Sequence, residues 1–277
     1  MLIAVDIGNT NLKTLAVLPN GDASHRSWNI PPDIGNIDDF ISQRLLRIET
    51  LTGTVDLRAN AYPKPITWRI IQTGRLDWKV LKTAILQVRP KDKFKQITHK
   101  QIPLKMDVDF PAKVGIDRLL AAFAAMYNYG NSPMLVVDAG TAITVDVVQN
   151  GTFRGGAILP GLACLSQVYP QISKKLPKVA IPQFSDADKV KLPTYPGKNT
   201  EDAILNGLYW GTVGAIGQFY DWVLSQTGEL GLILTGGDAE YLLRGLNTVL
   251  PSESIEYCET LVVEGILRLP EARTARP

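Results

Sequence analysis

The order of hydrophobic and polar positions predicts strands that alternate with amphipathic helices. The chain opens with the apolar run MLIAV, passes through a polar segment, and returns to an apolar run that ends before an Asn-Gly pair. Short apolar runs closed by turn residues are typical of buried strands, so we expect strands at 2–6 and 12–18 and a turn at Asn20-Gly21. The other predicted elements are strands at 66–71 and 230–238, helices at 37–50, 77–88, 116–129, 161–174, 200–227 and 259–269, and a helix that begins near Asp238.

The opening pattern occurs a second time. Residues 134–149 again read as an apolar strand, an Asp-x-Gly segment and a second apolar strand, and the turn pair Asn150-Gly151 follows. The matched pairs are Asp6 with Asp138, Gly8 with Gly140, and Lys13 with Val145. A hairpin that recurs with its polar loop intact indicates an internal repeat rather than a coincidence.

Composition limits the classes of protein that the chain can be. It has 277 residues, 45% of them apolar, which is enough to build one large core or two ordinary ones. The net charge of +2 is too small to imply nucleic acid or an anionic membrane as a partner, and the basic segment 89–105 fits a solvated loop. No apolar run forms a signal peptide or a membrane span, and the two cysteines and two histidines build no disulfide framework or histidine metal site. We therefore expect a cytoplasmic globular protein.

The first polar loop has the residues that a nucleoside triphosphate requires. Gly8, Asn9 and Thr10 offer backbone N–H groups in a tight loop, which forms a concave site for an anion. Asp6 can hold Mg²⁺ directly or through water, and Lys13 can place a positive charge on the transferring phosphate. The alternative is that Asp6 and Asn9 only shape a turn, as Asp and Asn residues commonly do. Two copies of the loop in one chain favour phosphate binding.

The second loop lacks a lysine, so the two loops differ chemically. Either it is a structural echo of the repeat, or Thr141 donates to a phosphate while Asp138 holds a cation. Further along, Gly236 and Gly237 stand where a strand passes into a helix. Paired glycines permit close approach of a flat ligand such as adenine, although many such pairs only form turns.

A third polar segment, Gly115-Ile-Asp-Arg118, begins a predicted helix. Asp117 could simply cap that helix, which is the commoner role of an isolated aspartate. Next to Arg118, however, it could orient a hydroxyl group beside an anion clamp. Phosphoryl transfer has a loose transition state in which a strong base is not needed to remove the hydroxyl proton early, so an ionised aspartate is a suitable proton acceptor.

Taken together, six motifs in this order resemble type III pantothenate kinase. They are Asp6-Ile-Gly-Asn-Thr-Asn-Leu-Lys13, Gly115-Ile-Asp-Arg118, Asp138-Ala-Gly-Thr-Ala-Ile-Thr-Val-Asp146, Gly155-Gly-Ala-Ile-Leu-Pro-Gly161, Asn199-Thr-Glu-Asp-Ala-Ile-Leu-Asn-Gly207 and Thr235-Gly-Gly-Asp238. The resemblance implies an α/β fold of two actin-like (ribonuclease-H-like) domains, each with a mixed sheet, that flank an ATP cleft. We expect these domains at 1–114 and 115–277, with the last helix packing back on the first domain.

The resemblance also implies the reaction and its residues. The family transfers the γ-phosphate of ATP to the 4′-hydroxyl of pantothenate, the first committed step of coenzyme A synthesis, and works as a homodimer. Loop chemistry and resemblance together indicate that ATP is bound by Asp6, Ile7, Gly8, Asn9, Thr10, Asn11, Leu12, Lys13, Thr141, Gly236 and Gly237. The residues expected to bind pantothenate are Gly115, Ile116, Asp117, Arg118 and Thr200. The expected catalytic residues are Asp117 and Lys13. Asp6 is expected to bind Mg²⁺ and Asp138 a monovalent cation, K⁺ or NH₄⁺.

One segment departs from the family pattern. Where the family has a Ser-Ser-Val-Val-Pro-like turn, this chain reads Ile71-Gln-Thr-Gly-Arg-Leu-Asp77, and Arg75 either replaces an anion ligand or belongs to a structural turn. Three other functions are weighed. A sugar-type kinase needs a substrate loop rich in Asn, His and Glu, a non-catalytic nucleotide-binding regulator usually lacks the equivalent of Lys13 or Asp117, and an iron–sulfur ATPase activator needs cluster cysteines.

Overall fold

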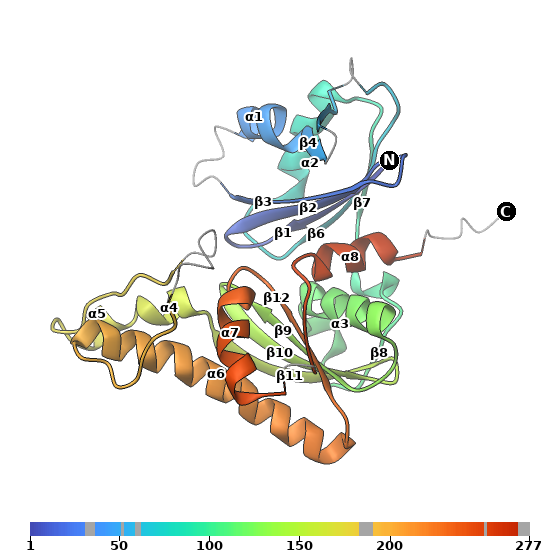
Figure 1. Ribbon diagram of the computed structural model, residues 1–277. Coiled ribbons are helices and arrows are strands. Elements are labelled where there is room, and N and C mark those ends of the chain that lie inside the picture. The colour runs from blue at the N-terminus through green and yellow to red at the C-terminus, as the bar shows by residue number, and fades with distance from the viewer. Residues whose placement is uncertain (31–36, 51–52, 59–61, 183–190, 252–253, 271–277) are drawn as a thin grey trace. The chain divides into compact units, whose positions relative to one another are not determined.

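The computed structural model describes residues 1–30, 37–50, 53–58, 62–182, 191–251 and 254–270 (Figure 1). The chain groups into two compact units, each built around its own sheet. Unit 1 comprises Met1–Pro103, Val114–Leu120 and Val262–Pro277, and unit 2 comprises Leu104–Lys113 and Ala121–Leu261. The domain boundary expected between residues 114 and 115 stays a prediction.

The sheet of unit 1 has five strands in the order β3-β2-β1-β6-β7. Strand β2 runs antiparallel to both of its neighbours, β3 and β1, whereas β1, β6 and β7 are parallel. The strands are β1 (Leu2–Ile7), β2 (Asn11–Val17), β3 (Ala23–Asn29), β6 (Thr67–Gln72) and β7 (Lys93–Gln96). Because β1 is the central strand and is covered on both faces, five of its six residues are buried, which explains the apolar run that precedes Asp6.

The sheet of unit 2 has six strands in the order β13-β12-β9-β10-β11-β8. Its strands are β8 (Lys105–Met106), β9 (Met134–Ala139), β10 (Ala142–Gln149), β11 (Thr152–Pro160), β12 (Gly231–Thr235) and β13 (Ile255–Tyr257). Strands β9, β10 and β11 form an antiparallel meander, and β12 and β13 continue from β9 in parallel. Five of its strands therefore repeat the order and direction of the unit 1 sheet. The internal repeat expected from the two hairpins thus extends to a whole five-stranded sheet.

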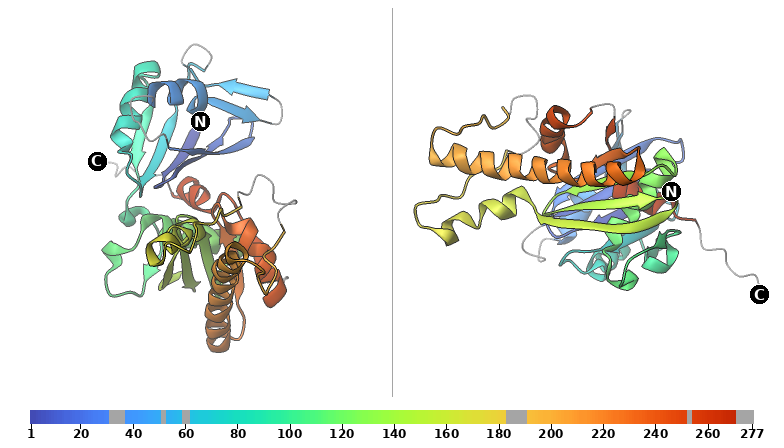
Figure 2. Two further views of the ribbon diagram at one scale, coloured as in Figure 1. Left: turned by 90° about the vertical axis from the view of Figure 1, so that its left-hand side faces the viewer. Right: turned by 90° about the horizontal axis from the view of Figure 1, so that it is seen from below.

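Helices cover both sheets (Figures 1 and 2). The described helices are α1 (Ile37–Phe40), α2 (Trp78–Val88), α3 (Ile116–Tyr129), α4 (Leu162–Ser166), α5 (Tyr169–Ile172), α6 (Thr200–Thr227), α7 (Ala239–Val249) and α8 (Leu261–Arg268), with a π-helical turn at Ile41–Leu45 and 3₁₀ turns at His99–Gln101 and Pro111–Lys113. In unit 2, the long helix α6 and helix α7 pack against each other and share one core with β9, β10 and β12.

Local chemistry explains where the predicted helices begin and end. The Asn199 side chain caps α6 by accepting a hydrogen bond from the backbone N–H of Asp202 at 2.8 Å. The same helix ends at Gly228, which has a φ of +76° that glycine adopts without strain. Helix α3 ends as predicted at Gly130, whose N–H donates to the carbonyl of Met126.

A buried arginine fastens the last helix within unit 1. Arg69 of β6 is only 4% exposed, and its Nη1 donates to the carbonyl oxygens of Ile266, Leu267 and Leu269. The last carbonyl groups of a helix have no partner inside it, and a cation there also complements the helix dipole. Gly265 of the same helix lets the helix backbone pack directly on α3, because a Cβ built on it would overlap the carbonyl oxygen of Leu120.

Two of the predicted helices are wrong in part. The helix expected at 37–50 ends at Leu45, because the chain then forms β4 (Arg47–Thr50), which pairs with β5 (Gly53–Asp56) in an antiparallel hairpin. The apolar positions of 37–45 are buried all the same, so the spacing identified the core residues but not the conformation that follows. The helix expected at 161–174 is broken between α4 and α5, where Pro170 begins a new turn.

Candidate functional site

The first hairpin places its acid directly opposite its lysine. In the pairing of β1 with β2, Asp6 is the register partner of Lys13, and Ile7 is the partner of Leu12. Directly opposite residues of an antiparallel pair have adjacent side chains on the same face of the sheet. Asp6 is 8% exposed, so the hairpin brings a buried carboxylate and a partly exposed ammonium group together at the end of the sheet.

The loop between these strands is tight and exposes its polar tip. The Gly8 N–H donates to the carbonyl of Asn11 at 2.9 Å, and the side chains of Asn9 and Thr10 are exposed. Ile7 and Leu12 are fully buried, so only their backbone groups are available to a ligand. The Oδ1 atom of Asn11 is buried and has no hydrogen-bond partner among the described residues. A buried polar atom without a partner calls for an explanation, and a ligand at the loop is one.

The structure corrects the pairing of the second hairpin. By sequence offset Val145 matches Lys13, but in the pairing of β9 with β10 the partner of Asp138 is Thr144. The second loop is one residue shorter, since the N–H of Gly140 donates to the carbonyl of Ala142, and Val145 is 2% exposed in the core. Sequence offset failed here because a one-residue change in loop length moves every later side chain to the other face of the sheet.

Two glycines hold other backbone segments against the second loop. The N–H of Gly161 donates to the carbonyl of Thr141, and a Cβ built on Gly161 would lie 2.7 Å from that oxygen. A Cβ on Gly236, whose φ is +98°, would overlap the carbonyl oxygen of Ala139 and lie 2.6 Å from Oδ1 of Asp138. Unit 2 therefore brings Asp138, Thr141 and Gly236 together, and Gly237 next to them is exposed with open space around it.

Asp238 lies at the same place, where its N–H donates to the carbonyl of Ala139 at 2.9 Å. Its side chain makes no cap hydrogen bond to α7. Burial disfavours the charged carboxylate and raises the pKa of Asp238 to about 6. Sequence reasoning treated this residue only as the end of the Gly-Gly motif, and its burial could not be read from the sequence.

Asp117 lies in the first turn of α3 with its carboxylate held in place. Its Oδ1 accepts a hydrogen bond from the N–H of Arg118 at 2.9 Å. A Cβ built on Gly115 would come within 2.5 Å of that same oxygen, so a larger residue there would displace the carboxylate from this position. Asp117 and Arg118 are both partly exposed, and the buried Ile116 anchors the start of the helix. The carboxylate thus caps its own helix, as the simpler interpretation expected, and remains accessible from solvent.

The remaining predicted residue, Thr200, is exposed in the first turn of α6. The predicted residues accordingly divide between the units. Unit 1 holds the segments Asp6–Lys13 and Gly115–Arg118, and unit 2 holds Asp138, Thr141, Thr200, Gly236 and Gly237.

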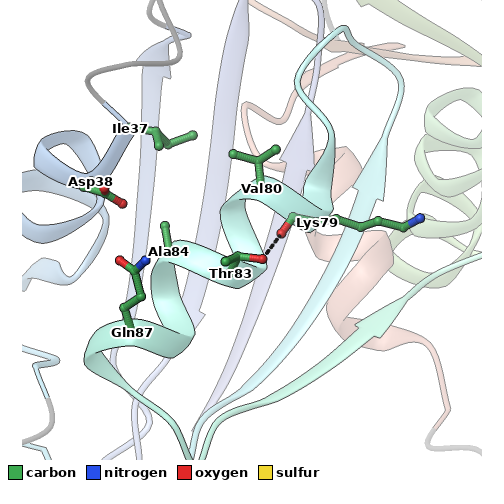
Figure 3. Close-up of a pocket in the computed structure, with 7 residues that line it drawn as sticks. All are labelled: Ile37, Asp38, Lys79, Val80, Thr83, Ala84 and Gln87. Carbon is green, nitrogen blue, oxygen red and sulfur yellow. Dashed lines mark hydrogen bonds between the residues drawn. The ribbon is translucent and has the colours of Figure 1, made fainter.

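A hollow of about 320 Å³ in unit 1 lies elsewhere (Figure 3). It is lined by Ile37, Asp38, Lys79, Val80, Thr83, Ala84 and Gln87. In Figure 3 the side chain of Lys79 points away from the other six residues, and the Thr83 hydroxyl donates to the Lys79 carbonyl of its own helix. None of the predicted site residues lines this hollow, so the polar loops rather than the hollow are the candidate site.

The comparisons agree with the motif order. The type III pantothenate kinase family profile matches residues 2–221. The chain is 29% identical over 259 residues to a type III pantothenate kinase of Rhodopirellula baltica, covering 88% of this chain and 90% of that protein. It is also 29% identical to the Acidiphilium cryptum type III pantothenate kinase, covering 100% of this chain and 96% of the other.

A solved structure described as a candidate Baf family transcriptional activator from Campylobacter jejuni shares the fold, with a TM-score of 0.54. It is 22% identical and 96% of each chain is covered, which supports the fold alone. The predicted α/β class with two mixed sheets is confirmed. Among the described residues, no helix is both long and apolar enough to cross a membrane. With the family profile matched over most of its length, the chain belongs to the type III pantothenate kinase family, whose members phosphorylate pantothenate with ATP in coenzyme A biosynthesis.

Proposed function

We propose that this chain transfers the γ-phosphoryl group of ATP to the 4′-hydroxyl of pantothenate with Lys13 and Asp117 as its catalytic residues. The register pairing of Asp6 with Lys13 is the observation that carries the proposal. Phosphoryl transfer depends mainly on positioning and on charge stabilisation, and this pairing puts a carboxylate and a cation on adjacent sites of one rigid hairpin.

In this proposal the loop 8–11 holds the phosphates of ATP. Its tip is exposed, and its glycine leaves the backbone open to close approach. Ile7 and Leu12 contribute through backbone atoms, since their side chains belong to the core. Lys13 lies close enough to stabilise the charge on the transferring group.

The residues present fit the two cations that the family implies. Among the described residues no three His, Cys, Asp or Glu side chains gather into a complete metal cage. Mg²⁺ usually takes one or two carboxylates and completes its shell with phosphate and water, so the buried Asp6 is a suitable single ligand. Asp138 would hold K⁺ or NH₄⁺, because its Oδ1 and the Ala139 carbonyl oxygen both lie at the Gly236 turn and oxygen atoms are the ligands that hard cations prefer. When bound, Mg²⁺ would neutralise charge on the phosphates.

Asp117 would accept the proton of the attacking hydroxyl. The hydrogen bond from the Arg118 N–H fixes one carboxylate oxygen, which orients the group. An ionised carboxylate accepts the proton late, as a loose transition state permits. Gly115, Ile116 and Arg118 would shape the pantothenate site around it.

Unit 2 would hold the nucleotide from its second loop. Thr141 is exposed beside Gly161 and would touch ATP, and the open space around Gly237 suits the approach of a flat adenine ring. We also expect a homodimer, and the exposed Ile158 and Trp222 give unit 2 apolar surface that a second copy could bury.

The experiment is ADP release from ATP with pantothenate, with and without K⁺, beside sugar controls. Turnover with pantothenate and not with sugars supports the proposal. Turnover with a sugar would favour the sugar-type kinase. ATP binding without any turnover would favour the non-catalytic regulator, and in either case the roles given to Asp117 and Lys13 would be withdrawn.

A further inference from the structure

The turn that departs from the family pattern lies against the first loop. Strand β6 runs parallel to β1, and the last register pair joins Ile7 to Gln72. The carboxyl ends of both strands therefore meet at the same edge of the sheet. The carbonyl of Ile7 accepts hydrogen bonds from the N–H groups of both Thr73 and Gly74, each at 2.9 Å. Two donors to a single carbonyl tie the turn to the residue that begins the loop.

Gly74 makes the closest contact. A Cβ built on it would overlap the carbonyl group of Gly8 and lie 2.7 Å from the amide nitrogen of Asn9. These are backbone atoms, which cannot move aside as the end of a flexible side chain could. The φ of Gly74 is not in the left-handed region, so the requirement for glycine is one of space alone. The turn therefore fixes the position of the loop backbone from behind.

The rest of the turn is rigid. The Gln72 side chain spans it, because its Oε1 accepts from the N–H of Trp78 and its Nε2 donates to the carbonyl of Gly74. Asp77 then caps α2 by accepting from the N–H of Lys79. A side chain carried between these fixed points, such as that of Arg75, starts from a well-defined position.

The equivalent turn of unit 2 is shorter. There the N–H of Asp238 donates to the carbonyl of Ala139, as that of Gly74 donates to Ile7, and α7 begins at the next residue. In unit 1, three more residues follow Gly74 before α2 begins at Trp78. The first of these extra residues is Arg75, which is exposed.

Arg75 has the reach and the freedom to meet an anion at the loop. Because its neighbour touches Gly8, its Cα lies within about 7 Å of the Gly8 carbonyl oxygen. Among the described residues its side chain makes no hydrogen bond or ion pair. The guanidinium group binds phosphate oxygens in a bidentate manner and never loses its charge near neutral pH.

We infer that the turn 72–77 is part of the phosphate site, with Gly74 as a positioning residue of the loop and Arg75 as a further ligand of the β- or γ-phosphate. The inference rests on the proposed function, because it takes the loop 8–11 to be where the phosphates bind. It gives the loop two positively charged side chains, that of Lys13 from β2 and that of Arg75 from the turn after β6.

The first test compares Arg75→Ala, Arg75→Lys and the matched control Arg44→Ala, which removes an exposed arginine from another element of unit 1. Binding of ATP and of AMP is measured directly by calorimetry with Mg²⁺. Loss of a charge-assisted hydrogen bond should weaken ATP binding by about 10- to 100-fold and leave AMP binding unchanged. Arg75→Lys should recover part of the loss. Equal ATP affinity in Arg75→Ala and Arg44→Ala would overturn the role of Arg75.

The second test compares Gly74→Ala with Gly214→Ala, where an added methyl group meets no atom within 4 Å. We expect Gly74→Ala to raise the KM for ATP about tenfold or lower kcat, with the KM for pantothenate unchanged. A variant that only loses thermal stability would show that Gly74 has a structural role alone.

The variant Lys13→Ala distinguishes a failure of this inference from a failure of the proposed function. If Lys13→Ala weakens phosphate binding or transfer and Arg75→Ala does not, the inference fails and the proposed function stands. If neither variant differs from the wild type in binding ATP, the loop is not the phosphate site and the proposed function fails with the inference.

Discussion

The hairpins β1–β2 and β9–β10 are two versions of one structure with different chemistry. Each has an aspartate as the second-last residue of its first strand, continues into a glycine-containing loop, and belongs to a sheet of the same strand order. They differ in the residue that faces the aspartate, which is Lys13 in the first and Thr144 in the second. The comparison teaches that the repeat supplies the scaffold, while one register position gives the first hairpin a positive charge that the second lacks.

The turns that support the two loops also differ in charge, and again the positive residue is in unit 1. Unit 1 inserts Arg75 and its neighbours between the strand end and α2, whereas unit 2 passes directly into α7 at Asp238. Unit 1 thus contains Lys13, Arg75 and the candidate base Asp117, whereas the second loop of unit 2 has Asp138 and Thr141 and no lysine or arginine. In the proposed function, the residues for the transfer belong to unit 1 and the residue for the monovalent cation belongs to unit 2.

The largest expected effect sharpens the assignment of catalysis to unit 1. Asp117→Asn should lower kcat by about 10²- to 10⁴-fold, since a positioned base contributes about that much. The substitution keeps the shape of the side chain, so calorimetry should show ATP and pantothenate binding close to wild type. Full turnover in this variant would remove Asp117 from the chemistry.

A second substitution tests the role of the second hairpin. Asp138→Ala should abolish the dependence of the rate on K⁺, because the carboxylate that would hold the cation is gone. Rates are measured across a K⁺ series, with Na⁺ at constant ionic strength as the reference. A K⁺ response that persists unchanged would move the cation site elsewhere.

The smallest effect concerns stability rather than turnover. The pKa of Asp238 is raised from 3.8 to about 6 by burial, so the wild type loses stability as the pH rises from about 4 through 6 and the buried carboxyl ionises. Asp238→Asn cannot ionise and should not show this loss. Its Tm should match the wild type below about pH 4 and exceed it by a few degrees above pH 6, at about 2–4 °C per kcal/mol. Calorimetric scans without nucleotide measure this difference, and a gap that does not change with pH would contradict it.

Much of the fold could be predicted from the sequence because local patterns determine its strands and helices. Buried central strands need continuous apolar runs, and the α6 helix carries its own caps at Asn199 and Gly228. The hairpin β4–β5 was missed because the apolar spacing of 37–45 continues to Ile48, which is buried in a strand instead of a helix. Periodicity reports which positions are buried more reliably than the backbone that buries them.

The site was predictable in its residues but not in its pairings. The sequence suggested Asp6 and Lys13 together, yet only the strand register makes them direct neighbours. The same register shows Thr144 opposite Asp138 in place of Val145. The support of the first loop by Gly74 depends on parallel strands whose paired residues, such as Ile7 and Gln72, are 65 positions apart in the chain, and no local pattern carries such a contact.

The central claim is that the residue opposite the aspartate distinguishes the two hairpins. The most direct test is the single-turnover rate of phosphoryl transfer from saturating ATP to pantothenate in the wild type, Lys13→Thr and Thr144→Ala. Lys13→Thr copies the second hairpin into the first and should lower the rate by about 10²- to 10³-fold, whereas Thr144→Ala should stay close to wild type. Equal rates in Lys13→Thr and the wild type would contradict the account.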